Sequence, residues 1–409
     1  MAKKESRLVT FFFMFLSFSF GNLYAAIAFE LAFDQEAAVQ VVSNPKSPRP
    51  PDGKRKRIQF KEELTIGVVE GDENYMFGDF IIFNTDDEGN FYITDWDRRR
   101  IQKYSPEGKF LLTIGKQGQG PGEFGNLSIA RFDSRNRIYV TDISNQRIHF
   151  FDPSGNFLEQ IKIPEVFENL YINSKGNYVS SHTREADSDY GGMAFQLEWG
   201  IFDSQFKLVS EFASKVMDRK PPGGRDASSR AKFMGGLLSD MAFRPQPYYV
   251  VSDNDLIYFG IPEKYVIDVY SPEGKKLRSI ERDYDPIEIT EKDRNQFEWT
   301  VAERLLRRDS EENKKETHKF IKYPQYKPAY SSFALMENGW LAVVVESIQN
   351  EHTLFDLFDQ DGIYIGHFRV EIPAEYLFFR NGKAYAVATV NDYKFAKRYG
   401  IEIVEEGRK

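Results

Sequence analysis

The stretch DDEGNFYITDWDRRRIQKYSPEGKFLLTI (Asp86–Ile114) recurs without a gap as DSRNRIYVTDISNQRIHFFDPSGNFLEQI (Asp133–Ile161). Matching positions, such as Tyr92 and Tyr139, keep one separation of about 47 residues. Each copy holds three short strand-like runs separated by turn signals. A unit of this kind at this period is typical of a blade in a β-propeller. The repeat therefore predicts an all-β fold built as a ring of blades.

The two ends of the chain are expected to share one blade. FKEELTIG (Phe60–Gly67) resembles GKFLLTIG (Gly108–Gly115), the last strand of the first copy. Nothing before it could supply the other three strands of its blade. The final unit, which ends with RYGIEIVEE (Arg398–Glu406), has first, second and third strands but no fourth. Pairing of the two segments removes the open sheet edges, and predicts a six-bladed β-propeller over residues 59–406 that an N-terminal strand closes.

A resemblance to a known family supports this count. The run from Gly89 to Gly125 includes YITDWDRRRIQKYSPEGKFLLTIGKQGQGPGEFG. It resembles the NHL repeat and the exported bacterial six-bladed propellers built from that repeat. The resemblance implies the fold and an exported location. Because members of such families range from protein-binding and RNA-binding modules to lyases, it leaves the activity open.

Composition restricts the partners. The chain has 409 residues, a formal net charge of −8 and no cysteine. A protein that binds phosphate backbones needs a basic surface, so nucleic acid is not expected as a partner. The lack of cysteine excludes disulfides, thiol catalysis and thiolate metal sites.

The N-terminus has the pattern of an export signal. Lys3 and Lys4 precede the apolar segment Leu8–Phe20, and small residues follow it. This pattern predicts a signal peptide over residues 1–28, with an uncleaved N-terminal anchor as the alternative. Either reading places the rest of the chain outside the cytoplasm, as a periplasmic, extracellular or membrane-anchored protein. The membrane is an expected partner only if the N-terminal segment is not cleaved. Residues 29–58 are rich in proline and charge, which predicts a flexible leader.

Two stretches do not fit the blades, and both join a fourth strand to the next first strand. Residues 213–246 are predicted as a loop, and residues 281–330 as one inserted helical segment. In a propeller, all these connections and all second-to-third loops emerge on one face, here called the insertion-bearing face. Long connections are often functional. Ligand contacts are therefore expected on this face.

The inserted helix has a recognisable start. Thr290 and Asp293 form an N-terminal capping arrangement, and an apolar stripe at helical spacing follows. The stripe consists of Phe297, Val301 and Leu305. We expect Phe297 and Trp299 to pack onto the propeller.

Arginine, aromatic and acidic side chains on the expected mouth loops are the candidate binding residues. Arginine and aromatic groups at loop tips are what binding hot spots use, and ordinary solvated loop composition is the competing reading. The candidates are Trp96, Arg98, Arg99, Arg184, Asp187, Tyr190 and Glu346.

Both copies of the repeat also place an aspartate five residues before an arginine. The pairs are Asp95 with Arg100 and Asp142 with Arg147. One reading is a charged ring around the channel. We favour an ion pair or turn hydrogen bond that braces the loop, because both copies share the pattern.

These patterns favour an exported module that binds a protein, peptide or glycan at the cell envelope, without catalytic residues, metal ligands or a cofactor. The alternative is a metal-dependent propeller hydrolase or lyase with its site in the central channel. Calcium is compatible with Asp79, Asn126 and Asp253, but no such position repeats around the ring.

Overall fold

The computed structural model describes residues 39–189, 191, 194–218, 223, 224, 226–348, 352–370 and 376–406. The expected signal (1–28) and the start of the expected leader lie outside these residues. Within the described part, no helix is both long and apolar enough to cross a bilayer.

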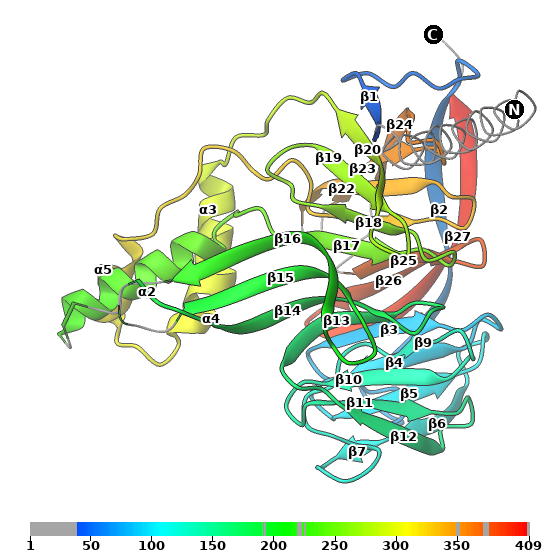
Figure 1. The fold of residues 1–409 in the computed structure, drawn as a ribbon, viewed down its shortest axis with the longest axis horizontal. Helices are drawn as coiled ribbons and strands as arrows, with labels where there is room; N and C mark the ends of the chain where they lie inside the picture. Colours follow the sequence, from blue (N-terminus) through cyan, green and yellow to red (C-terminus); the bar gives the residue numbers. More distant parts are fainter. Residues whose placement is uncertain are drawn as a thin grey trace, which may run out of the picture. The chain divides into compact units, whose positions relative to one another are not determined.

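Antiparallel sheets form the six blades of a β-propeller (Figure 1). Blades 1 and 2 consist of β3 (Ile81–Thr85), β4 (Phe91–Asp95), β5 (Arg100–Tyr104) and β6 (Phe110–Ile114), and of β9 (Arg131–Phe132), β10 (Ile138–Asp142), β11 (Arg147–Phe151) and β12 (Phe157–Lys162). Blades 3 and 4 consist of β13 (Val166–Ile172), β14 (Tyr178–Ala186), β15 (Ala194–Phe202) and β16 (Leu208–Asp218), and of β17 (Tyr248–Val251), β18 (Ile257–Gly260), β19 (Val266–Tyr270) and β20 (Lys276–Arg282). Blade 5 consists of β21 (Ser332–Leu335), β22 (Leu341–Ile348), β23 (His352–Phe358) and β24 (Tyr364–Val370).

Blade 6 closes the ring as predicted. Its first three strands are β25 (Tyr376–Arg380), β26 (Lys383–Val390) and β27 (Tyr393–Glu406), and its fourth is β2 (Arg55–Ile66). β2 pairs antiparallel with β27 from Arg55 opposite Glu406 to Ile66 opposite Ala396. In the ring, the first strands of neighbouring blades contact each other, as β17 does with β21 and β21 with β25. The first strands therefore line the central channel.

Part of the expected leader is a strand. β1 (Gln40–Asn44) adds to blade 4 outside β20. Asn44 is buried; its side-chain nitrogen donates to the carbonyls of Glu281 (3.0 Å) and Gly362 (2.9 Å). Its side-chain oxygen accepts from the backbone N–H of Tyr364 at 2.7 Å. One amide thus links blades 4 and 5, so the prediction of a flexible segment was wrong for these residues.

The insertion at 213–246 is not a loop. β16 continues to Asp218, and α2 (Ala227–Met241) follows. Asp226 caps the helix by accepting the backbone N–H of Ser229 at 2.9 Å. α2 packs on α5 (Glu311–His318) of the second insertion, with Leu238 fully buried. The two insertions form one helical unit with a small core of its own. The loop prediction did not include this packing between two segments that are distant in the sequence.

The second insertion begins as predicted and then changes register. Thr290 and Asp293 form the capping box of α3 (Glu291–Phe297). Phe297 is buried, but in the core of the helical unit with Leu238 and not on the propeller as expected. A π-helical turn, η1 (Glu298–Ala302), then leads into α4 (Glu303–Leu306). A π turn adds a residue to the helical repeat, so Leu306 takes the core position predicted for Leu305, which is 46% exposed. Trp299 is 78% exposed, contrary to expectation.

The connector between blades 1 and 2 is held in place by Phe124. β7 (Lys116–Gln117) and β8 (Glu123–Phe124) pair in parallel within it. The Phe124 ring is fully buried and packs among residues of both blades, including Phe151. A Cβ on Gly115, whose φ is +69°, would come within 2.1 Å of this ring. The GxGPGEF motif is thus an inter-blade packing element.

Candidate functional site

The insertion-bearing face is defined by strand direction. Each first strand begins at this face and each fourth strand ends there. The loops that join second to third strands lie at the same face. Figure 1 shows β14, β15 and β16 extending toward α2 and α4. The two helical insertions therefore stand on the face where the sequence predicted the binding residues.

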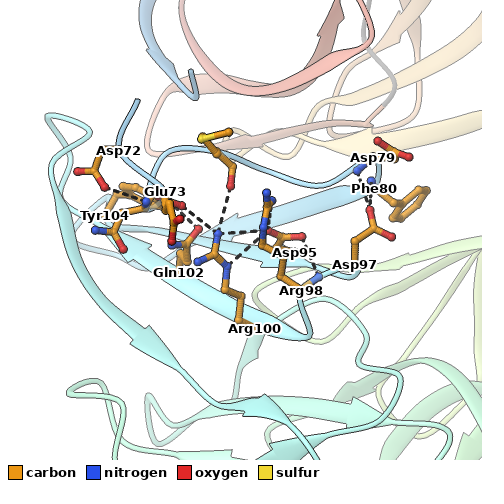
Figure 2. A network of polar contacts seen from close by, with 12 residues as sticks. Asp72, Glu73, Asp79, Phe80, Asp95, Asp97, Arg98, Arg100, Gln102 and Tyr104 are labelled. Atoms are coloured by element: carbon orange, nitrogen blue, oxygen red, sulfur yellow. Dashed lines mark hydrogen bonds and ion pairs between the residues drawn. The ribbon is translucent and has the colours of Figure 1, made fainter. Parts of the chain in front are cut away.

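In blade 1 the mouth residues hold the loops to one another (Figure 2). Asp95 is fully buried; it accepts from Arg98 Nη1 at 3.2 Å and lies 3.5 Å from Arg100 Nε. Arg100 also donates to the backbone carbonyls of Glu73 (3.2 Å) and Met76 (3.1 Å). The Asp95–Arg100 pair is thus the brace that was favoured.

Trp96 and Arg99 also make contacts within the protein. The Trp96 indole stacks on Phe80, with ring centroids 4.3 Å apart. Arg99 donates to the backbone carbonyl of Gly125, in the next connector. Both residues lie where they were predicted, at the mouth, but much of their surface is used to fix the loops.

The other predicted residues lie far from blade 1 along the ring. Arg184 belongs to β14, where it donates to Glu198 Oε1 at 3.1 Å from Nη2, so the strand continues into what was predicted as a loop. Asp187 follows β14 and is exposed. Glu346 lies within β22, again on a strand. Tyr190 lies outside the described residues. The structure thus distributes the predicted residues over blades 1, 3 and 5 and does not bring them together.

The proposed calcium residues do not converge either. The backbone N–H of Asp79 donates to Asp97 at 2.6 Å, and that of Asn126 donates to Asp142 at 2.9 Å. Asp253 lies in the turn between β17 and β18, at the other end of the first strands. Among the residues that the structure describes, no group of three or more His, Asp or Glu side chains could hold a metal ion.

The second copy of the aspartate–arginine pattern differs from the first. Asp142 accepts backbone N–H groups of Gly125 (2.7 Å) and Asn126 (2.9 Å), and the Asn145 side chain (2.8 Å). Asn145 stands where blade 1 has Arg98. Arg147 instead donates to the Gln119 carbonyl at 2.9 Å. Both copies therefore brace the loop as expected, blade 1 through an ion pair and blade 2 through hydrogen bonds within the turn and to the connector.

His149 is a buried imidazole beneath the connector. It is fully buried, packs edge-on against Phe124, and has no hydrogen-bond partner on either ring nitrogen within the described chain. Burial lowers its pKa from the ordinary 6.5; Asp142, 4.0 Å away, opposes that shift and Arg147 adds to it. His149 is therefore neutral in the folded protein at neutral pH.

We expect His149→Gln to make stability less sensitive to acid. Blade 1 carries Gln102 at this repeat position, so glutamine suits the site. Because the folded-state pKa lies below the unfolded value, the unfolded chain takes the proton first, and stability falls as the pH drops below about 6.5. In the wild type, His149 contributes up to about 1.4 kcal/mol per pH unit to the pH dependence of the free energy of unfolding. The free energy of unfolding, measured with urea, should differ less between pH 7 and pH 5 in the variant than in the wild type. Equal differences in the two proteins would contradict a neutral, buried His149.

A buried arginine, Arg131, lies in the central channel. It is on β9, the first strand of blade 2, and is 9% exposed. Its guanidinium lies over the ring of Tyr171, 3.8 Å from the centroid, and donates to the side-chain oxygen of Asn169. Tyrosines, Tyr171 first, are the groups that interact most strongly with its charge. No carboxylate in the described ranges lies within ion-pair distance of it.

Tyrosines from three further first strands interact with this arginine. Tyr171 is on β13 of blade 3, Tyr248 on β17 of blade 4 and Tyr376 on β25 of blade 6. Tyr248 interacts electrostatically with Tyr171, Tyr376 and Arg131. Blades 2, 4 and 6 are not neighbours, so their side chains can approach only across the channel. Arg131, Tyr171, Tyr248 and Tyr376 are called the channel cluster below.

The hydroxyls of the channel cluster are available to a ligand. Two nearby tyrosines use theirs within the fold: that of Tyr139 accepts from Ile172 N–H at 3.0 Å, and that of Tyr249 donates to the Asn169 carbonyl at 2.9 Å. The three cluster tyrosines are partly exposed, and their hydroxyls have no hydrogen-bond partner among the described residues. Burial raises the pKa of Tyr248 and Tyr376, so these phenols remain protonated donors.

Two of the cluster tyrosines lie at the insertion-bearing end of the first strands. Tyr248 and Tyr376 are the first residues of β17 and β25, at the mouth end of their strands. Arg131 stands near the far end of its inner strand, next to the turn that begins at Asp133. A ligand entering from this face would meet the two tyrosines first and the arginine last.

This cluster was not predicted from the sequence. The residues predicted for binding were assigned to loops, whereas each member of the cluster lies on a first strand. One signal was present: Arg131 aligns with Asn84, so both copies place a polar residue two positions before the turn of a strand that is otherwise apolar. Polar residues at this point of an inner strand are candidates for a position near the ring axis.

Comparisons with known proteins agree with the fold. Residues 82–219 match a family described as "6-bladed beta-propeller". Among solved structures, a Bacteroides fragilis protein predicted to be exported is similar at 13% identity with a TM-score of 0.52, covering 89% of this chain and 100% of that one. Virginiamycin B lyase from Staphylococcus aureus is similar at 9% identity with a TM-score of 0.41, covering 84% and 99%. No curated protein matches the sequence. At such identities the likeness shows the fold alone.

Proposed function

We propose that this six-bladed β-propeller is an exported binding module at the cell envelope, whose insertion-bearing face recognises a protein, peptide or glycan. The observation that carries the proposal is the channel cluster. Four blades contribute an arginine whose charge no described carboxylate neutralises and three tyrosines whose hydroxyls have no hydrogen-bond partner among the described residues. Ligand sites combine apolar walls with a few convergent polar groups in this way. Tyrosine and arginine are also the residues that dominate binding hot spots.

The mouth supports the same reading. The loops of blade 1 are fixed by the Asp95 brace, and the two insertions build a helical unit beside blade 3 that has its own core. Exposed Trp299 lies on that unit. Elements held in place by such contacts favour recognition, because little order is lost on binding. The exported location is proposed from the basic and apolar N-terminal pattern.

The test is to screen the purified protein against a glycan array and a random-peptide phage library. Tyr248→Phe and Tyr376→Phe serve as channel variants. Removing a hydroxyl that has no protein partner should leave the melting temperature unchanged. We expect probes that bind the wild type to bind the double variant at least about tenfold more weakly, the loss of roughly one hydrogen bond or more.

Two results would contradict the proposal. Probes that bind wild type and the double variant equally well would place recognition elsewhere. One tightly held metal equivalent in the purified protein, together with turnover of a bound probe, would instead favour the metal-dependent hydrolase or lyase.

A further inference from the structure

The ligand group that enters the channel is inferred from the charge of the cluster. Building on the proposed binding function, we propose that this group is a carboxylate and that Arg131 is its counter-ion. The inference narrows the ligand to one that carries a carboxylate on a group small enough to enter the channel. It rests on three features of the described residues: an uncompensated charge, convergent donors and a single cation.

The first feature is a buried charge without a compensating acid. Other arginines with little exposure have carboxylate partners: Arg137 lies 2.8 Å from Asp133, and Arg282 lies 3.2 Å from Asp356. Arg131 is 9% exposed. Within the described chain, its guanidinium contacts the neutral side-chain oxygen of Asn169 and the ring face of Tyr171, but no carboxylate. Leaving a cation uncompensated in a protein interior is unfavourable. A bound anion would supply the negative charge that the protein itself does not place beside Arg131.

The second feature is a set of unpartnered donors near the arginine. The hydroxyls of Tyr171, Tyr248 and Tyr376 lack partners in the described chain; Tyr171 lies directly under the Arg131 guanidinium, and Tyr248 and Tyr376 interact electrostatically with it. Hydrogen bonds to an ionised acceptor are stronger than those between neutral groups. Phenol donors around a guanidinium therefore favour an anionic acceptor over a neutral one.

The third feature is that the cluster contains one positive charge. A guanidinium matches the two oxygens of a carboxylate with parallel N–H donors. Phosphate carries up to two negative charges near neutral pH, and no lysine or second arginine belongs to the cluster. A phenol carries no positive charge, so the tyrosines cannot balance the second negative charge. A carboxylate carries one negative charge and therefore matches the single positive charge of Arg131.

The experiment measures thermal shifts of the full-length protein at constant ionic strength with matched probes. One arm compares methyl β-D-glucuronide with the neutral methyl β-D-glucoside. The other compares N-acetyl-alanine with N-acetyl-alanine amide. A ligand that binds only the folded state raises the melting temperature by mass action. We expect at least one carboxylate to raise it by a few degrees, with no rise from its neutral partner.

Variants assign the effect to the residue. Arg131→Gln should abolish the shift, whereas Arg135→Gln, an exposed arginine in the β9–β10 turn, should keep it. Without probe, Arg131→Met should melt no lower than wild type, because it removes an uncompensated buried charge. If Arg131→Gln does not fold, Arg131→Lys, which keeps the charge but not the two-pronged donor, should weaken the shift.

The outcomes separate this inference from the proposed function. A shift in the glucuronide arm identifies an acidic sugar as the source of the carboxylate, and one in the peptide arm identifies a peptide terminus. Equal shifts from carboxylate and neutral probes, lost in Tyr248→Phe, would overturn the carboxylate and leave channel binding intact. The carboxylate inference would also be overturned if neither arm gave a melting-temperature shift that depends on Arg131. A larger Arg131-dependent shift with sodium phosphate would overturn it as well.

Discussion

Replacing Phe124 with alanine is expected to lower the free energy of unfolding by about 3–5 kcal/mol, the usual result of emptying a fully buried phenylalanine site. The ring is 0% exposed and lies 5.9 Å, centroid to centroid, from Phe151 of blade 2. It packs in the same cluster as Ile101 and Ile114 of blade 1. The cavity would therefore open between two blades, where neither sheet can collapse to fill it.

Urea or guanidinium unfolding followed by circular dichroism measures this effect. Domains of this kind are marginally stable, by about 5–15 kcal/mol, so the variant should unfold at clearly lower denaturant. Leu158→Ala is the control, because that side chain is 47% exposed on blade 2, and it should cost much less. Equal losses in the two variants would mean that the connector is not anchored as described.

Much of the fold could be predicted because the first two blades are near copies of each other. Repetition of Tyr92 at Tyr139 fixed the strand pattern, and the partnerless fourth strand identified the closing pair. The elements that were missed depend on contacts distant in sequence. β1 is held by Asn44 against Gly362 of blade 5, and α2 is stabilised by packing on α5. Neither contact leaves a local pattern in the sequence.

The candidate site was predicted less well, for a geometric reason. Loop residues such as Trp96 are easy to recognise, but a ring separates the loops of different blades. Arg131 and Tyr376, in contrast, interact electrostatically across the ring although their first strands are distant along the chain. Only the closed ring creates this proximity, and no spacing in the sequence reveals it. The π turn in the inserted helix is a similar case, because it moved Leu306 into the core in place of Leu305.

A disulfide between β2 and β27 is expected to form readily and to stabilise the protein by roughly 3–5 kcal/mol, because the loop that it closes contains most of the chain. Gln59 and Glu402 are directly opposite each other in the antiparallel pair and both are exposed. Opposed residues in such a pair have Cβ atoms close enough for a disulfide. Since the chain has no cysteine, the engineered pair is the only thiol chemistry present.

The measurement that tests ring closure most directly is the oxidation of this double variant, Gln59→Cys with Glu402→Cys, read by mass spectrometry and by the denaturation midpoint. Both the six-blade count and the convergence of the channel cluster depend on this closure. The control pairs Gln59→Cys with Val209→Cys on β16 of blade 3, an exposed position on a different sheet. We predict near-complete intramolecular disulfide and a higher midpoint for the first pair, and neither for the control. A first pair that stays reduced, or a control that cross-links as readily, would contradict the closed propeller.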